Sequence, residues 1–258
     1  MQWTTIFKKE MLEYARNYSW IWVPIVFIIL AIMDPLTTYY LPKILDTVGG
    51  LPEGATFDIP QPPPAQALYM SLSEFSMFGV VIVVLITMGT IAGERQSGVA
   101  ELVLVKPVGY FTYISSKWAA KLLLIWSSYI VGMLASWYYV NLLFGEIAFT
   151  TVVQVILFYG LWLTLVTTIT IFFNTLVKTP LLVGFLSIAV MIAMSVVNSV
   201  FSHRLIWFPN NLSSYILQMM DTGTIPTDLW ATALIIIGLI VVLLVAALFT
   251  FRTREMAN

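Results

Sequence analysis

The chain has 258 residues, of which 60% are hydrophobic and only 10% are charged, and its formal net charge is −1. Soluble domains carry about a quarter charged residues, whereas apolar runs longer than about 18 residues recur throughout this sequence. The composition therefore excludes a soluble globular domain and predicts an all-α, polytopic membrane protein with a single membrane domain over residues 1–258. The absence of cysteine excludes disulfides, thiol catalysis and zinc–thiolate or iron–sulfur sites.

Residues 2–18 predict an amphipathic helix that lies in the membrane interface. Aromatic and aliphatic side chains recur on one face at intervals of three and four residues, and the opposite face is charged. Such a helix places its rings in lipid and its lysines toward anionic headgroups. The alternative is a solvated tail before the first span. The apolar face includes Trp3, Phe7 and Met11, and the charged face consists of Lys8, Lys9, Glu10, Glu13 and Arg16.

Six apolar segments predict transmembrane helices, separated by connections of different character. A Pro/Gly-rich loop over residues 42–67 follows the first span and is expected to be extended, with its role left open. Residues 202–228 mix aromatic, asparagine and apolar residues, which predicts interfacial or re-entrant helices. The spans are expected at about residues 20–40, 68–92, 118–144, 150–177, 181–201 and 229–251.

Basic residues set the predicted orientation. With the N-terminus inside, six spans return the C-terminus to the same side, and ten of the twelve lysines and arginines are cytoplasmic. Only Lys43 and Arg204 then lie outside. The sequence therefore predicts that both termini are cytoplasmic.

The longest charged interruption between two apolar segments runs from Gly93 to Lys121. Its first part, residues 94–106, has a helical pattern that Pro107 ends, because proline lacks an N–H donor and its ring clashes with the preceding turn. A short helix of this kind offers a docking surface to a soluble partner. Glu94, Arg95 and Glu101 would make directional contacts there, and Leu102 would fill an apolar cleft. The alternative is that the charges pair with one another or with water.

Catalytic and nucleotide-binding signals are missing. No Gly-Lys dipeptide occurs, so the chain has no phosphate-binding loop of the P-loop kind. The single histidine, His203, lies beside Arg204 without an adjacent acid, which favours a polar anchor. Metal ligands at helical spacing are absent. We therefore expect that the chain is not an enzyme by itself.

Two features of the second span carry open alternatives. Glu74 lies one or two turns into the span, where it either lines a substrate pathway or is an acid near the helix start that the macrodipole stabilises. None of the spans has a carboxylate at its centre, which weighs against secondary transport. Gly89 and Gly93 form a small-xxx-small pair that allows close helix approach.

The order of these parts resembles the ABC-2 type permease family, the membrane subunits of a class of ATP-binding-cassette exporters. The resemblance covers the whole chain and includes six spans with both ends inside. Its motifs are an elbow-like segment at residues 6–11 with Arg16-Asn17 before the first span, then Gly93-Glu-Arg-Gln-Ser-Gly98, Glu101-Leu-Val-Leu, Lys106-Pro-Val108 and Lys117. The long Pro-rich loop is less typical of the family and leaves the substrate class open.

The resemblance implies a permease subunit in a bacterial plasma membrane, coupled to a separate ATP-binding subunit. Its partners would be that subunit, a second copy or a paralogous permease, and the lipid bilayer, with no nucleic acid. The chain would bind no cofactor, since ATP and Mg belong to the partner. The first, second and fifth spans would line the path. The coupling helix would involve Glu94, Arg95, Gly98, Glu101, Leu102 and Lys106, and the elbow helix Phe7, Lys8, Lys9, Glu10 and Arg16.

Other functions remain as alternatives. An ATP-independent secondary carrier or channel would work without a partner, an intramembrane enzyme would depend on His203 or Glu74, and an anchor or sensor would transport nothing. The scarcity of charge in the spans favours an amphipathic or apolar substrate.

Overall fold

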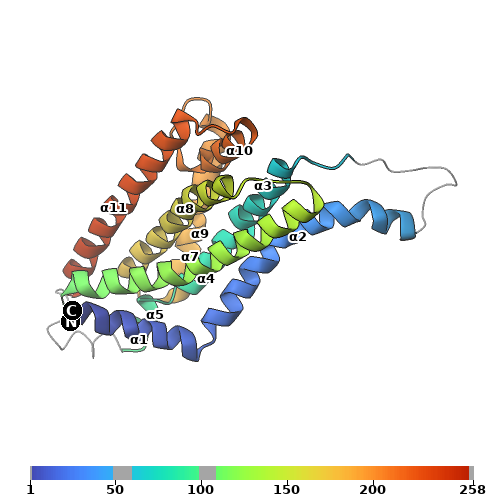
Figure 1. The fold of residues 1–258 in the computed structure, drawn as a ribbon. Helices are drawn as coiled ribbons and strands as arrows, with labels where there is room; N and C mark the ends of the chain where they lie inside the picture. Colours follow the sequence, from blue (N-terminus) through green and yellow to red (C-terminus); the bar gives the residue numbers. More distant parts are fainter. Residues whose placement is uncertain (1, 49–59, 99–108, 256–258) are drawn as a thin grey trace.

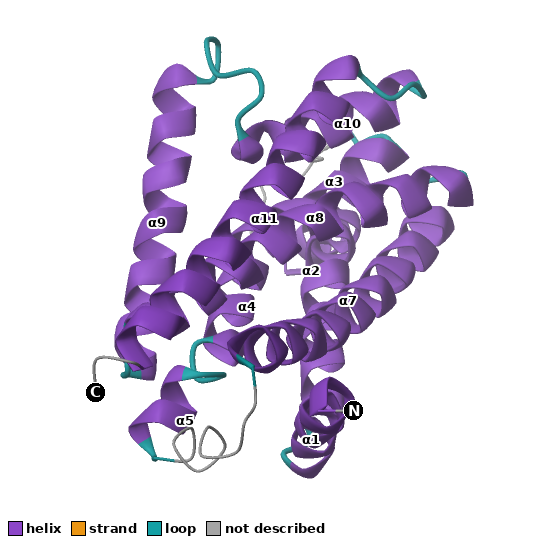
Figure 2. Cartoon of the chain, turned by 90° about the vertical axis from the view of Figure 1, so that its left-hand side faces the viewer, coloured by secondary structure: helices purple, strands orange, loops and turns teal. Residues whose placement is uncertain are grey.

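A computed structural model of the protein describes residues 2–48, 60–98 and 109–255, and this part of the chain contains helices and no strands (Figures 1 and 2). In chain order the elements are α1 (Gln2–Arg16), α2 (Ser19–Val48), α3 (Pro64–Glu74), the π-helix η1 (Phe75–Gly79), α4 (Val80–Thr87), α5 (Ala92–Gln96), α7 (Tyr110–Leu143), α8 (Phe149–Leu176), α9 (Pro180–Phe201), the 3₁₀ helix η2 (Pro209–Asn211), α10 (Leu212–Thr222) and α11 (Thr227–Glu255).

Six stretches of helix are long and apolar enough to cross a membrane, which confirms the predicted polytopic fold. They cover Ser19–Ile44, Pro64–Gln96, Tyr110–Leu143, Phe149–Leu176, Pro180–Phe201 and Thr227–Thr253. The second stretch is assembled from α3, η1, α4 and α5. The first helix, α1, lies at the end of the bundle where α11 finishes, and α10 lies at the opposite end (Figure 1). These are called the α1 end and the α10 end below.

The centre of the bundle is α8. In the most apolar 18-residue segment of α8, 83% of the residues are buried, whereas 22% are buried in the corresponding segments of α9 and α11. Several threonines of α8 are buried, and their hydroxyls donate to the preceding turn of their own helix, as Thr167 does to the carbonyl of Leu163 at 2.7 Å. Polar side chains are thereby accommodated in the core, while the outer helices present apolar side chains to the surroundings.

Helices α2 and α7 approach each other closely at Gly132. A Cβ placed on Gly132 would lie 2.9 Å from the carbonyl oxygen of Phe27, so only glycine allows α2 to pass at this distance. The expected pair Gly89 and Gly93 makes no such close contact with the residues that the structure describes. A Cβ on Gly89 would have no neighbour within 4 Å, and one on Gly93 would meet only a Pro180 side-chain atom at 3.9 Å.

Several spans, α2 and α7 among them, extend further than the apolar pattern indicated. Helix α2 continues to Val48, so Lys43 lies on a helix and not in a loop, with its ammonium group 4.6 Å from the ring of Tyr39. That cation–π contact favours the helical conformation. Helix α7 begins at Tyr110, because its first turns pack on α11 through the rings of Tyr113 and Phe251, whose centroids are 5.7 Å apart.

The connection between α9 and α11 folds back onto the bundle as η2 and α10. The amide of Asn211 donates to the carbonyl of Leu205 at 2.9 Å, and the Tyr215 hydroxyl donates to the carbonyl of Ile206 at 2.8 Å. These bonds fix the shape of the connection, and α10 packs against α3 and α8 (Figure 1). Helical structure was expected in this region, and it closes the α10 end.

Candidate functional site

A buried lysine occupies the meeting point of α1, α5 and α7. The ammonium group of Lys117, on α7, lies 2.6 Å from a carboxylate oxygen of Glu10 and 3.0 Å from one of Glu94. The Lys117 side chain is 2% exposed and that of Glu10 is 4% exposed. Charges with so little access to water are costly unless they are paired. This pairing therefore fixes the three helices relative to one another.

Lys9 supplies a second cation to the same carboxylates. Its ammonium group donates to Glu94 and also lies 3.4 Å from Glu10 and 3.6 Å from Glu13. Partial burial opposes the charge of Lys9, but the hydrogen bond to Glu94 and the surrounding carboxylates outweigh it and raise its pKa above the ordinary value. Lys9 is consequently protonated throughout the physiological pH range.

Each of the two central carboxylates also accepts a hydrogen bond from a tyrosine. The Tyr113 hydroxyl donates to Glu94 at 2.5 Å, and the Tyr14 hydroxyl donates to Glu10 at 3.4 Å. Burial, followed by the nearby Glu10 charge, raises the pKa of Tyr14, so its hydroxyl stays protonated and remains a donor. We refer to Lys9, Glu10, Tyr14, Glu94, Tyr113 and Lys117 as the charge cluster.

The cluster follows from helical spacing on α7. Tyr113, Lys117 and Lys121 are four residues apart and share one face of the helix. The ammonium group of Lys121 lies 4.3 Å from the centroid of the Tyr14 ring, which extends the contact between α7 and α1 by one more turn. The elbow-like start of the chain is thus held by two lysines of a single helix.

Helix α5 is fastened to α8 and α11 on its other side. Between α4 and α5 the side-chain oxygen of Asn174 accepts hydrogen bonds from the backbone N–H groups of Ile91 and Ala92, at 3.1 and 2.9 Å. These N–H groups start a helix and have no partner within it. Arg95 donates to the carbonyl of Thr175 at 3.0 Å, and its guanidinium lies 5.5 Å from the centroid of the Phe251 ring.

The structure corrects the expected orientation of three charged side chains. Glu94 and Arg95 were expected to face a soluble partner, but Glu94 points into the charge cluster and Arg95 is buried against α8. Glu10 was expected on the headgroup-facing side of its helix and is buried as well, because Lys117 provides a cation in the interior.

The remaining expected residues lie in different places. Lys8 and Arg16 are exposed, and Phe7 stacks on Trp3 with ring centroids 5.2 Å apart. Gly98 has a φ of +77°, a left-handed conformation that suits glycine. Glu101, Leu102 and Lys106 lie outside the described residues, and so does most of the helix expected over residues 94–106.

Glu74 does not belong to the cluster. It lies in the second span toward the α10 end, beside Asp34 of α2, and one of its carboxylate oxygens is buried without a hydrogen-bond partner among the described residues. The sequence did not indicate this contact, because 40 residues separate the two acids in the chain and their proximity depends on how α2 packs against α3.

Glu10 and Glu94 of the charge cluster, together with Glu13, are close enough to one another to hold a cation, but lysines already neutralise them. Carboxylate oxygens of Glu10, Glu13 and Glu94 lie within 4.8 Å of one another. The ammonium groups of Lys9 and Lys117 already lie among them, so the negative charge is balanced by lysine. A cavity of about 460 Å³ adjoins the cluster, and its lining includes Glu10, Glu94, Lys117 and Lys121.

Tyr14, Tyr113, Lys117, Lys121 and Asn174 are parts of this arrangement that sequence reasoning did not place in a site. The two lysines carried a usable signal, since they occur four residues apart at the start of an apolar helix, and ionisable residues in such segments need partners. The sequence did not indicate which acids would meet them.

The bundle and its buried charges define a polytopic helical membrane protein with six candidate spans. Residues 56–257 match the family described as "Protein of unknown function (DUF2705)", and the chain belongs to this family. The chain is also similar to the "Uncharacterized transmembrane protein YxlG" of Bacillus subtilis (strain 168), with 30% identity over 204 residues that cover 79% of each protein. The family match includes α5 and α7 but begins after α1 and α2.

Proposed function

We propose that the protein is the permease subunit of an ATP-binding-cassette exporter in the plasma membrane, working with a second permease and with separate ATP-binding subunits. The observation that carries the proposal is the charge cluster. It joins α1, α5 and α7, so the segment between α5 and α7 is attached at both ends to one buried network. A partner that pushes this segment would move all three helices.

The energetics of burial support a joint movement. Separating Lys117 from its carboxylates would leave a charge unpaired in the interior, at a cost of about 3–5 kcal/mol. The three helices would therefore shift together under a force, and Arg95 and Asn174 would extend the shift to α8. Packed interfaces of this kind change between discrete arrangements and do not deform continuously.

The sequence has no P-loop, so in the proposed exporter the nucleotide would be bound by another subunit. ATP and Mg would be bound there. Export of an amphipathic or apolar substrate agrees with the scarcity of charge in the spans.

An ATP-independent secondary carrier is the second candidate, and the contact between Glu74 and Asp34 favours it. Two neighbouring carboxyl groups disfavour each other's charged form, and proton-coupled carriers use acids within their spans to relay protons. In this chain the pair lies toward the α10 end and not at the centre of a span, which is why we place the carrier second.

The test is purification from native membranes in mild detergent, followed by an ATPase assay of the isolated complex. We expect an ATP-binding subunit to copurify with the native protein. Glu94→Gln, which keeps the shape but removes the charge that both lysines contact, should lower the ATPase rate several-fold. Lys8→Gln is the matched control, since Lys8 is exposed on the same end of the bundle, and should leave the rate unchanged.

A different outcome of the same purification would exclude the exporter. If no ATP-binding subunit copurifies and the protein alone dissipates a proton gradient in liposomes, the exporter is excluded and the carrier takes its place. Loss of that activity in Glu74→Gln would then assign the carboxyl pair to proton transfer.

A further inference from the structure

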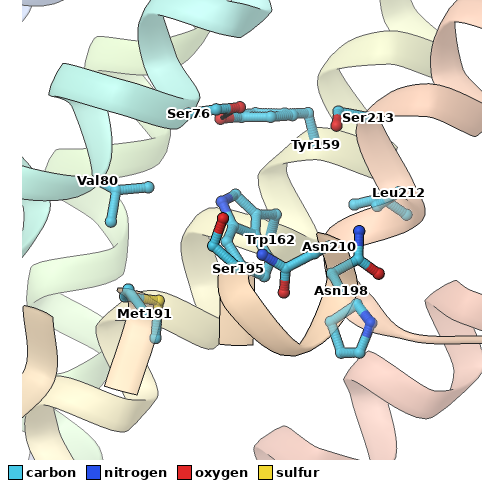
Figure 3. Close-up of a pocket in the computed structure, with 11 residues that line it drawn as sticks. Ser76, Val80, Tyr159, Trp162, Met191, Ser195, Asn198, Asn210, Leu212 and Ser213 are labelled. Carbon is cyan, nitrogen blue, oxygen red and sulfur yellow. Dashed lines mark hydrogen bonds between the residues drawn. The ribbon is translucent and has the colours of Figure 1, made fainter. Parts of the chain in front are cut away.

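A second polar site lies toward the α10 end, away from the charge cluster. It is a cavity of about 250 Å³ between η1, α8, α9 and the η2–α10 connection (Figure 3). We refer to it as the polar cavity. Its polar lining consists of the side chains of Ser76, Tyr159, Ser195, Asn198, Asn210 and Ser213, and its apolar lining includes Val80, Met191 and Leu212.

Two amide oxygens in the polar cavity have no hydrogen-bond donor. The side-chain oxygens of Asn198 and Asn210 are buried, and no partner for them occurs among the residues that the structure describes. Buried acceptors are nearly always paired in proteins, since leaving them unpaired is costly. Because both residues line the cavity, their side-chain amides are the groups that a molecule entering it would meet.

The opposite wall of the cavity is held in place by bonds within the protein. The hydroxyls of Ser76 and Tyr159 lie 2.8 Å apart, and Ser76 also donates to the carbonyl of Leu72 at 2.8 Å. Ser76 belongs to the π-helix η1, a conformation that is rare and occurs frequently at functional sites. This wall is preformed, which lowers the entropic cost of binding.

Among the residues that the structure describes, none that lines the cavity carries a carboxylate, lysine, arginine or histidine side chain. A charged group would lose its hydration here without gaining a counter-charge, so an uncharged ligand is favoured. The free acceptors require a ligand with donors, and the serine hydroxyls can both donate and accept. Hydroxyl groups meet both requirements.

The size of the cavity limits how much of a ligand it holds. A volume of 250 Å³ corresponds to about eight molecules of liquid water, which is enough for one sugar ring. The rest of the ligand would lie outside. Met191, Ser195 and Asn198 face the cavity from α9, while the neighbouring Ile192 and Val196 are 59% and 57% exposed on the same helix. An alkyl chain would pack along these side chains.

We propose that the polar cavity binds the uncharged, hydroxyl-bearing headgroup of an amphiphile whose alkyl chain lies along α9. The binding site is independent of the proposed exporter function, because it requires neither ATP nor a partner subunit. A carrier or a sensor with this structure would have the same site.

The test uses an octyl glucoside probe with a photoreactive diazirine in its alkyl chain. The native protein in lipid nanodiscs is irradiated with the probe, and the labelled peptides are identified by mass spectrometry. We expect labelling on α9 and α10 that unlabelled octyl glucoside competes away. Octyl sulfate and octyltrimethylammonium, which have the same chain and charged headgroups, should compete at least tenfold less well.

Variants of the cavity provide a second measurement. Asn198→Leu and Asn210→Leu each remove an acceptor and add apolar volume, and each should lower the labelling at least tenfold. Ser199→Ala is the matched control: Ser199 neighbours Asn198 but is exposed and donates to its own helix at Val196, so labelling should be unchanged.

Equal competition by all three amphiphiles would overturn the proposal, since the headgroup would then not be recognised. Saturable labelling that is absent from α9 and α10 would also overturn it and would indicate that water alone fills the cavity. These outcomes are obtained with the native chain, so they stand even if a leucine variant does not fold.

Discussion

Lys117 has two carboxylate partners, whereas Glu10 and Glu94 share two lysines, so the residues of the charge cluster are not equivalent. Removing Lys117 leaves two acids with one half-exposed cation. Removing the charge of Glu10 leaves Lys117 paired with Glu94. The cost of each substitution should therefore differ, although all of the contacts belong to one network.

We predict that Lys117→Met lowers the free energy of unfolding by about 3 kcal/mol, and that Glu10→Gln lowers it by less. Methionine keeps the length of the side chain and removes only the charge that balances the acids. The measurement is unfolding in increasing mole fractions of dodecyl sulfate, followed by far-UV circular dichroism. Lys8→Met is the control, because Lys8 is exposed. A cost for Lys117→Met no larger than for Lys8→Met would contradict the role of the cluster.

A second prediction concerns the glycine where α2 crosses α7. Gly132→Ala should destabilise the protein by about 1–3 kcal/mol, because the new Cβ would meet the backbone of Phe27 at 2.9 Å. Gly238→Ala on α11 is the control, with no neighbour within 4 Å. It should be neutral or stabilising, since alanine favours helix over glycine by about 1 kcal/mol. Thermal unfolding of the two variants in a mild detergent measures the difference. Equal effects of the two substitutions would contradict the close packing of α2 on α7.

For single residues, the sequence indicated some members of the charge cluster but not the contacts between them. Lys9, Glu10 and Glu94 were all identified as charged residues of the two helices that meet. Glu10 was assigned to the surface because helical periodicity separates charged from apolar faces without knowing what lies opposite. Its partner Lys117 is 107 residues away in the chain. A local sequence pattern cannot predict a contact between residues so far apart.

The packing of helices near the α10 end can be tested by cross-linking α3 to α7. Ser71 on α3 and Ser136 on α7 have their hydroxyl oxygens 2.7 Å apart in the core. The double substitution Ser71→Cys and Ser136→Cys should therefore form a disulfide on mild oxidation, since the two sulfur atoms would lie within bonding reach. The chain has no native cysteine, so any internal cross-link reports this pair alone. Intact mass after alkylation measures it.

The control combines Ser71→Cys with Ser127→Cys, which lies on the same helix as Ser136. Nine residues of α-helix separate these positions by about 13 Å, so Ser71→Cys with Ser127→Cys should remain reduced. Cross-linking of the second pair and not of the first would show that α3 and α7 are shifted along each other.

Apolar segment length was sufficient to predict all six spans, because a membrane-crossing helix needs a continuous apolar run whatever its neighbours are. The ends of the helices depended on contacts. The start of α7 at Tyr110 is set by packing on α11, and the polar run before Trp118 gave no sign of it. The π-helix η1 was also not predicted, since Phe75–Gly79 has an ordinary helical composition.

For the molecule as a whole, α8 connects the two polar regions. Asn174 and Thr175 at one end of this helix hold α5, and Tyr159 and Trp162 further along line the polar cavity. Because α8 is the most buried span, a shift of α5 would be passed along it as a rigid element. Residues of one helix, α8, thus contact both α5, which carries Glu94 of the charge cluster, and the polar cavity.

The distribution of basic residues predicts an orientation of the bundle in the membrane. Ten of twelve lysines and arginines lie on one side if the α1 end is cytoplasmic. We predict that Lys8→Cys and Lys178→Cys react with a membrane-impermeant maleimide only after cells are permeabilised, whereas Arg204→Cys reacts in intact cells. All three native side chains are exposed, so accessibility to the reagent depends on the side of the membrane. Each variant serves as the control for the others within the same cysteine-free background. Reaction of Lys8→Cys in intact cells would place the charge cluster outside, where no ATP-binding subunit reaches it, and would remove the basis of the exporter proposal.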